Sequence, residues 1–371
     1  MPAGFARPLN LPDFPWDTIA AAAARARSHP DGVCDLSVGT PVDPVPRSGQ
    51  QALAAASDAH GYPATAGSPQ LRDAIRSYLT SRWRAVELTD TGVLPVIGTK
   101  ELVAWLPTLL GLGAQDTVVI PATAYPTYLV GARIAGCRVV TADNPDEVYD
   151  ETPALVWINS PANPTGRVLT FEQTRAWVGY ARQRGALLAA DECYGEFGYE
   201  AEPVSVLDAA VNDGDLTGLL GGYSLSKRSN LAGYRAGFVA GDPALVSHLL
   251  GVRKHLGMMV PAPVQAAMTV LLADQDHVTE QRQRYLARRQ RLRPALTACG
   301  LRIDHSQAGL YLWASRDESG RDTVDWLADL GILAAPGDFY GPAGTHHVRI
   351  ALTATDERIA AAADRLLVAA S

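Results

Sequence analysis

The order of short apolar runs and helical stretches is the feature of this chain that most restricts its fold. The apolar runs have the length of buried β-strands and lie at residues 92–97, 117–120, 137–140, 154–158, 186–190 and 219–223. Helical stretches between them include residues 100–112 and 170–184, and the second begins with Thr170-Phe171-Glu172-Gln173, a capping-box pattern. This alternation predicts a parallel or mixed sheet covered by helices, an α/β fold.

The last third of the chain has a different pattern. A long arginine-rich helical run at 262–296 leads to strands expected at 309–313 and 346–352, followed by a final helix at 356–369. A helix expected at 17–28 lacks a strand partner of its own, so we expect it to pack on this second part. For 371 residues we therefore predict two domains. The large domain is 36–265, and the small domain combines 1–35 with 266–371.

Charge and composition exclude several classes of protein. The net charge of −7 provides no general attraction to nucleic acid or to an anionic membrane. The apolar runs are all far shorter than the ~20 residues that span a bilayer. Residues 1–8 lack the pattern of a secretory signal. Four scattered cysteines without ligand spacing favour free thiols in the cytoplasm and no metal site.

Lysine is rare in this chain. Three of the 32 basic residues are lysines, and one of them, Lys227, lies in Ser224-Leu225-Ser226-Lys227, among small hydroxyls and glycines. A desolvated lysine can lose its proton, and the free amine can attack a carbonyl, which arginine cannot do. An isolated Ser-x-x-Lys is more often a surface lysine in a polar loop, so the flanking motifs must decide.

Three further motifs follow predicted strands. The tight turn at 159–166 (NSPANPTG) lies where ligands bind in open α/β sheets. Asp191, at the end of the next strand, either caps the following element or holds a cationic ligand atom. The segment Gly98-Thr99-Lys100-Glu101 joins a strand to a helix and could hold a phosphate through its backbone N–H groups. Walker and GxGxxG spacings are absent, so nucleotide binding is poorly supported.

Together these segments resemble the class I/II aminotransferases, the fold-type-I enzymes that use pyridoxal 5′-phosphate (PLP). The resemblance extends from 37–41 (SVGTP) to 347–352 (HVRIAL). It implies a large domain with a mixed, mostly parallel seven-stranded sheet between helices, and a smaller α+β domain. It also implies that Lys227 binds the cofactor aldehyde and that Asp191 pairs with the pyridinium nitrogen. An anion at that nitrogen favours its protonated form, which makes the ring an electron sink.

The resemblance assigns the remaining site residues as well. Tyr194 and Asn163 match the partners of the phenolic oxygen, and Tyr125 matches the aromatic residue that stacks on the pyridine. Arg349 matches the arginine that grips the substrate α-carboxylate, with the Gly39 backbone beside it. The phosphate would be held by Gly98, Thr99, Lys100, Ser224, Ser226 and Arg235, together with Tyr62 of the neighbouring subunit. This last residue implies a homodimer with shared active sites.

In finer detail, residues 14–17, 36–44, 96–102 and 231–237 resemble the actinobacterial type of N-succinyldiaminopimelate aminotransferase. That resemblance implies amino transfer between glutamate and N-succinyl-2-amino-6-oxopimelate on the lysine and diaminopimelate route. Alternatives are an aminotransferase of aspartate, aromatic or kynurenine specificity, or a β-C–S lyase that keeps Lys227 and Asp191. A ligand-sensing regulator domain is a weaker alternative, because such regulators carry a DNA-binding domain ahead of this one.

Overall fold

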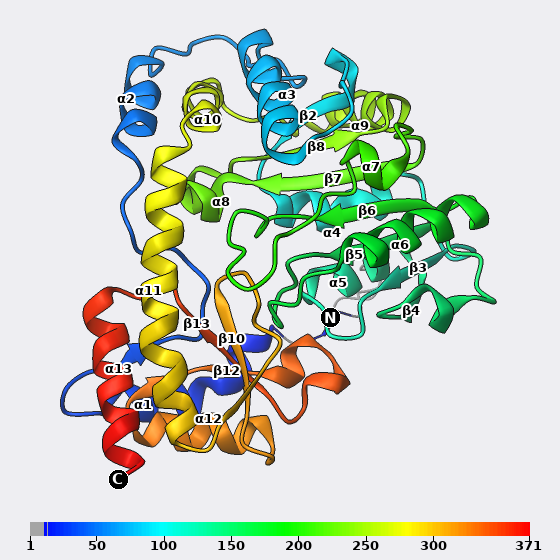
Figure 1. Ribbon diagram of the computed structural model, residues 1–371. Helices are drawn as coiled ribbons and strands as arrows, with labels where there is room; N and C mark the ends of the chain where they lie inside the picture. The colour runs from blue at the N-terminus through cyan, green and yellow to red at the C-terminus, as the bar shows by residue number, and fades with distance from the viewer. Residues whose placement is uncertain (1–10, 13) are drawn as a thin grey trace, which may run out of the picture.

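The computed structural model describes residues 11–12 and 14–371. The N-terminal residues 1–8, in which the sequence shows no secretory pattern, lie outside the described part. Figure 1 shows two stacked regions, with the long helix α11 (Asp276–Ala298) running along both of them. Short 3₁₀ helices occupy Pro15–Ile19, Asp90–Gly92, Pro145–Val148, Ala232–Tyr234, Gly337–Tyr340 and Pro342–Gly344.

The upper region is built on a seven-stranded sheet with the order β2-β8-β7-β6-β5-β3-β4. Strand β8 runs antiparallel to its neighbours β2 and β7, and the other pairs are parallel. This confirms the predicted α/β fold with a mixed, mostly parallel sheet. The strands are β2 (Val93–Val96), β3 (Thr117–Ile120), β4 (Arg138–Thr141), β5 (Leu155–Asn159), β6 (Leu187–Asp191), β7 (Leu219–Ser224) and β8 (Gly237–Gly241).

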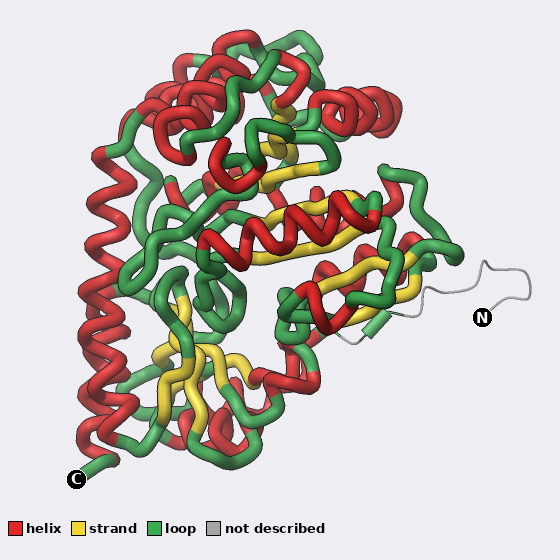
Figure 2. Tube along the Cα trace, turned by 45° about the vertical axis from the view of Figure 1, so that its right-hand side comes forward, coloured by secondary structure: helices red, strands yellow, loops and turns green. Residues whose placement is uncertain are grey.

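Helices cover both faces of this sheet, and Figure 2 shows one of them, α6, crossing in front of the strands. One core lies between the sheet and α3, α6 and α10, and another lies between the sheet and α4, α5 and α9. The capping box of α6 is confirmed, because Thr170 Oγ1 accepts the Gln173 N–H and Gln173 Oε1 accepts the Thr170 N–H. The helices of this region are α2 (Arg47–Ala55), α3 (Pro69–Trp83), α4 (Thr99–Leu109), α5 (Thr127–Ala135), α6 (Phe171–Arg184), α7 (Ala209–Asn212), α8 (Leu225–Arg228), α9 (Pro243–Leu256) and α10 (Ala262–Ala273).

The lower region has an antiparallel four-stranded sheet with the order β12-β13-β10-β9. Strand β1 (Cys34–Asp35) pairs in parallel with β11 (Ile332–Leu333), and α1 packs on α12. A third core fills this region. Its other elements are α1 (Ala20–Arg27), β9 (Arg302–Asp304), β10 (Tyr311–Ser315), α12 (Gly320–Asp329), β12 (Ala335–Pro336), β13 (Val348–Ala351) and α13 (Asp356–Ala369).

The helical run expected at 262–296 is two helices rather than one. After α10 the backbone of Asp274 is extended (φ −92°, ψ 111°), which ends the helix. The Oδ1 atom of Asp274 accepts the backbone N–H of Asp276 at 3.1 Å. A carboxylate that binds the first free N–H groups of a helix stabilises a new helix start. The run therefore divides between α10, which packs on α2 and α3, and α11, which reaches α13.

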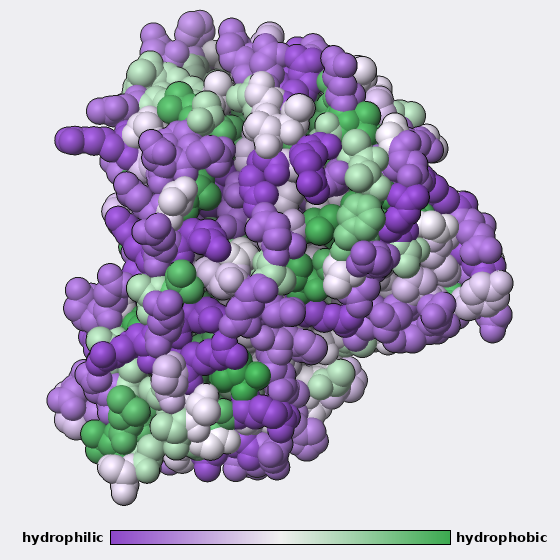
Figure 3. All heavy atoms as spheres, in the orientation of Figure 1, coloured by the Kyte–Doolittle hydropathy of each residue, from purple (hydrophilic) through white to green (hydrophobic). Residues whose placement is uncertain are grey.

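The surface, the helices and the cysteines each bear on the expectations from composition. On the face in Figure 3, hydrophobic residues lie in small groups among hydrophilic ones. The helices of the described chain are all too short or too polar to cross a membrane. Within the same part, no group of three or more His, Cys, Asp or Glu side chains is arranged to hold a metal ion. All four cysteines (Cys34, Cys137, Cys193 and Cys299) are free.

Candidate active site

The carboxyl ends of four strands meet at one edge of the large sheet. Asn159 at the end of β5 pairs with Asp191 at the end of β6, and Val96 of β2 and Ser224 of β7 both pair with Gly237. In open α/β sheets this edge is where ligands bind. The topology therefore brings the predicted motifs, which are far apart in the sequence, to one place.

Lys227 lies in the short helix α8, directly after β7. Ser224 Oγ accepts the Ser226 N–H at 3.1 Å and fixes the turn that precedes the lysine. The Lys227 ammonium donates a hydrogen bond to the carbonyl oxygen of Gly39. Burial lowers the pKa of Lys227, and the positive charge of Arg349 lowers it further. A lower pKa increases the fraction of free amine at neutral pH, which is the form that attacks a carbonyl.

Asp191 is buried and held on both carboxylate oxygens. Tyr128, on α5, donates its hydroxyl to Oδ2 at 2.8 Å, and the N–H of Cys193 reaches Oδ1 at 3.2 Å. The Asn159 amide donates to the backbone oxygen of Asp191 at 2.8 Å. The local bond from Cys193 matches the capping alternative, whereas the Tyr128 bond orients the carboxylate toward the sheet edge. Tyr128 was missed by the sequence analysis, because its contact spans 63 residues.

Arg349 lies on β13, in the lower sheet, and is buried to 3% exposure. Its guanidinium donates to Asn163 Oδ1 at 3.0 Å and to the Ser37 carbonyl at 2.7 Å. The Tyr311 ring lies 4.1 Å from the guanidinium carbon. Within the described residues Arg349 has no carboxylate partner, although a buried cation is costly without one. This arrangement fits an anionic ligand.

Tyr194 and Tyr311 form a hydroxyl pair beside these groups, with 3.1 Å between their oxygens. Burial raises the pKa of Tyr194, whereas the charges of Arg349 and Lys227 outweigh burial and lower the pKa of Tyr311. The Tyr311 hydroxyl packs against Gly39 so closely that any side chain at Gly39 would collide with it. Sequence analysis missed Tyr311, although its place in a predicted strand of the small domain was a signal.

A cationic cradle lies at the start of α4. Gly98 has a φ of +85°, and a Cβ there would collide with the guanidinium of Arg235. Arg235 donates to the Ala232 carbonyl at 2.8 Å and makes no ion pair in the part of the chain that the structure describes. The N-terminus of α4, at Thr99, adds free backbone N–H groups. A phosphate dianion fits this cradle, so the residues present fit PLP.

For three predicted site residues the structure gives less direct support for the predicted role. Tyr125 precedes α5 and stands edge-on to Tyr128, with ring centroids 6.1 Å apart. Lys100 is exposed in the first turn of α4. Tyr62 is 99% exposed. The stacking role of Tyr125, the phosphate roles of Lys100 and Tyr62 and the cofactor role of Asn163 stay predictions, as do the cofactor and substrate roles of the other site residues.

The fold and the site together define an α/β protein with a half-buried lysine, a buried carboxylate and an anion-binding helix N-terminus at one sheet edge. The sequence profile described as aminotransferase class I and II matches residues 31–366. The chain belongs to the class I and II aminotransferase family, whose members use PLP.

Individual relatives agree with this assignment. A probable aminotransferase of Mycobacterium tuberculosis, Rv1178, is 61% identical over 357 residues, which cover 96% of this chain and 85% of that protein. The 4-dedimethylamino-4-oxo-anhydrotetracycline transaminase OxyQ of Streptomyces rimosus is 56% identical over 357 residues, covering 96% of this chain and 99% of that protein. A solved structure of a probable N-succinyldiaminopimelate aminotransferase from Thermus thermophilus superimposes with a TM-score of 0.86 at 28% identity, covering 96% of this chain and 100% of that chain.

Proposed function

We propose that this aminotransferase moves an amino group between glutamate or 2-oxoglutarate and a second amino or oxo acid, with Arg349 holding the α-carboxylate. The observation that carries this proposal is the buried Arg349 guanidinium, which has no carboxylate partner among the described residues and whose charge acts on Lys227. A bidentate guanidinium–carboxylate pair would fix the Cα of the substrate relative to the amine.

PLP, when bound, supplies the electron sink that makes the substrate Cα–H acidic. In the proposal, the Lys227 amine would remove the proton from Cα of the amino donor in one half-reaction and deliver a proton to Cα of the product amino acid in the other, a role that its lowered pKa favours. Asp191, oriented by Tyr128, would keep the pyridine nitrogen protonated. Tyr194 would donate to the phenolic oxygen, and Arg235 and the N-terminus of α4 would hold the phosphate.

For the second substrate we propose N-succinyl-2-amino-6-oxopimelate. The sequence motifs and the name of the Thermus thermophilus neighbour support this choice. The distal anions of this substrate need cations beyond Arg349. Arg253 cannot supply such a cation, because it is fully buried and forms a bidentate ion pair with Glu101, at 2.8 and 2.9 Å. Exposed Lys100 is the candidate reader of the distal end.

A ketone on a fused ring system is a second candidate acceptor. The Streptomyces rimosus relative is named for such a substrate. The loop that carries Gly39 also exposes two aliphatic side chains, Val38 at 41% and Val42 at 50%. Exposed apolar side chains beside a polar site are suited to contact an apolar ligand.

The assembly and the location are also proposals. A homodimer with shared sites is supported by the exposure of Tyr62, which is free to reach a phosphate in a second subunit. The cytoplasm is supported by the free cysteines of the described chain. The domain bounds stay a proposal, 36–265 for the large domain and 1–35 with 266–371 for the small one, and the packing of α10 on α2 and α3 favours placing the large domain's end at Ala273.

A half-reaction screen tests the proposal. Purified protein loaded with PLP is mixed with single amino acids, and the cofactor absorbance bands are followed for conversion to the pyridoxamine form. Glutamate should convert the cofactor, and 2-oxoglutarate should reverse the change. Release of ammonia and an oxo acid without conversion would instead identify a β-C–S lyase. Borohydride reduction and peptide mapping should label Lys227, and a label on Lys100 or Lys254 would refute the assignment.

The same assay separates the two acceptors. Pyridoxamine-form enzyme is offered either the succinylated oxo acid or a polycyclic ketone, and the return of the aldehyde form is measured. Faster return with the polycyclic ketone would overturn the succinyl assignment while leaving the reaction class intact.

A further inference from the structure

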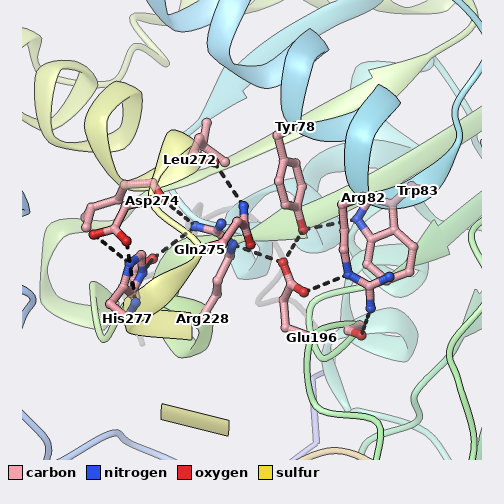
Figure 4. Close-up of polar contacts among 12 residues, drawn as sticks. Tyr78, Arg82, Trp83, Glu196, Arg228, Leu272, Asp274, Gln275 and His277 are labelled. Carbon is pink, nitrogen blue, oxygen red and sulfur yellow. Dashed lines mark hydrogen bonds and ion pairs between the residues drawn. The ribbon is translucent and has the colours of Figure 1, made fainter. Parts of the chain in front are cut away.

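An ion pair beneath the site joins the two chain segments that carry its main groups. Arg228 directly follows Lys227, and Glu196 lies two residues after Tyr194. Arg228 Nε is 3.1 Å from Glu196 Oε1, and the two side chains are 3% and 9% exposed (Figure 4). The pair therefore bridges the turn that holds Lys227 and the loop that follows Asp191.

Glu196 is also held from the opposite side. It accepts the Tyr78 hydroxyl at 2.8 Å and Arg82 Nε at 2.9 Å, so it lies between two arginines (Figure 4). Burial raises the pKa of Glu196, but Arg228 and Arg82 outweigh it and lower the pKa below its usual value. The carboxylate is thus ionised at neutral pH, and the pair is a true ion pair.

The other end of Arg228 reaches the junction of α10 and α11. Its Nη1 donates to the Leu271 carbonyl at 2.6 Å. The next residue, Ser229, has its hydroxyl 2.9 Å from His277 Nε2, and His277 Nδ1 lies 3.2 Å from Asp274 (Figure 4). The linked side chains of Ser229, His277 and Asp274 resemble a Ser-His-Asp triad, but Ser229 is fully buried. A nucleophile must reach its substrate, so these residues anchor Arg228's segment instead.

Stability alone explains this cluster poorly. Taking charges out of water is expensive, and well-packed apolar residues often replace a buried ion pair without loss of stability. Arg228 also leaves Nη2 without a hydrogen-bond partner among the described residues. The position of the pair, one residue from Lys227 and two from Tyr194, suggests a role in the site.

We propose that Arg228 and Glu196 are positioning residues, which fix the position of the Lys227 amine relative to the side chains of Asp191 and Tyr194. This inference rests on the proposed function for the roles of those three residues. Arg228 and Glu196 are buried behind the site and act through their neighbours. Their joint loss should lower the rate of proton transfer at the substrate Cα while leaving the carboxylate grip of Arg349 intact.

The test separates positioning from stability with three variants. Glu196→Gln removes the charge and leaves Arg228 unpaired. The double variant Glu196→Gln with Arg228→Gln removes both charges, and Arg82 keeps Glu202 at 3.0 Å, so no lone buried charge remains. Glu200→Gln is a control outside the site, because Glu200 also lies between two arginines, Arg289 and Arg293 at 2.5 Å each, with a more exposed side chain at 42%. Each holoenzyme is assayed for Tm, for the rate of borohydride trapping at Lys227, and for kcat and KM with glutamate.

We expect Glu196→Gln to lower both Tm and kcat, and the double variant to recover Tm but not kcat. The loss in kcat should be on the order of tenfold to a hundredfold, the usual effect of a misplaced reacting group, with KM for glutamate changed less than about twofold. Glu200→Gln should leave kcat near the wild-type value. Recovery of kcat together with Tm in the double variant, or an equal loss in the control, would overturn the inference.

Failure of the proposed function would look different. Wild-type protein would then show no conversion with glutamate or no trapping at Lys227. Trapping requires a lysine–cofactor bond but no amino transfer. A slower trapping rate in the double variant therefore supports positioning even if the amino donor is another acid.

Discussion

The hydrogen bond from Tyr128 to Asp191 should be measurable in the free energy of unfolding. Tyr128 is fully buried, and its hydroxyl lies 2.8 Å from Oδ2 of a carboxylate that is 8% exposed. A hydrogen bond to a charged group contributes about 1.5–3 kcal/mol. Tyr128→Phe removes it with little change in shape. For a chain of this length each kcal/mol corresponds to roughly 1.3 °C in Tm, so the variant should melt about 2–4 °C lower.

The assay is thermal unfolding of the apoprotein followed by circular dichroism, with Tyr340→Phe as the matched control. Tyr340 is 2% exposed, and its hydroxyl has no hydrogen-bond partner within the described residues. Its removal should leave Tm unchanged or slightly raised, because no bond is lost. Equal losses of Tm in the two variants would refute the reasoning, since the cost would then come from packing. The holoenzyme should show a reduced kcat only for Tyr128→Phe.

Three further predictions concern the cations of the site. Lys227→Met should raise the Tm of the apoprotein near neutral pH, because burial lowers the pKa of Lys227 and only the folded state bears the cost of its charge. The gain in Tm should shrink as the pH rises toward the ordinary lysine pKa of about 10.4, since the wild-type lysine then loses its proton in the folded protein. A gain that is constant with pH would contradict this explanation. Arg349→Lys keeps the charge but loses the planar guanidinium, so the fall in kcat/KM for glutamate should correspond to roughly 1.5–3 kcal/mol of transition-state stabilisation. A change in kcat/KM within twofold would rule out the carboxylate role. Lys100→Met should cost about 1–3 kcal/mol in kcat/KM for N-succinyldiaminopimelate but not for glutamate, and equal losses would move Lys100 to the phosphate.

Much of the large sheet could be predicted because each strand is a local apolar run. The run at 117–120 is β3 itself, and the final helix at 356–369 is α13. Strand β8 was missed, since Gly237–Gly241 is framed by glycines and is a strand because β2 and β7 lie on either side of it. Pairing of this kind is tertiary and leaves little local signal.

Some residues of the candidate site could be predicted from local sequence motifs, and others could not. Lys227 and Asp191 lie in recognisable motifs at strand ends, so their neighbourhood could be expected from sequence. Tyr128 and Tyr311 are supporting tyrosines whose hydroxyl partners are 63 and 117 residues away. A tyrosine in an apolar helix or strand has the pattern of an ordinary core residue. Its partner becomes visible only once the strands are in place.

The two ends of the candidate site are built from different cores. Asp191 ends β6 of the seven-stranded sheet and Lys227 directly follows β7, whereas Arg349 belongs to the four-stranded sheet, and the Arg349–Asn163 hydrogen bond crosses between the two regions. A substitution that repacks the lower core can therefore shift the carboxylate anchor, together with Tyr194 and the Gly39 contact of Lys227, while Asp191 and the turn that carries Lys227 stay in place. Divergence in substrate choice can proceed in one half of the molecule, and the half that carries the reaction stays under separate constraint.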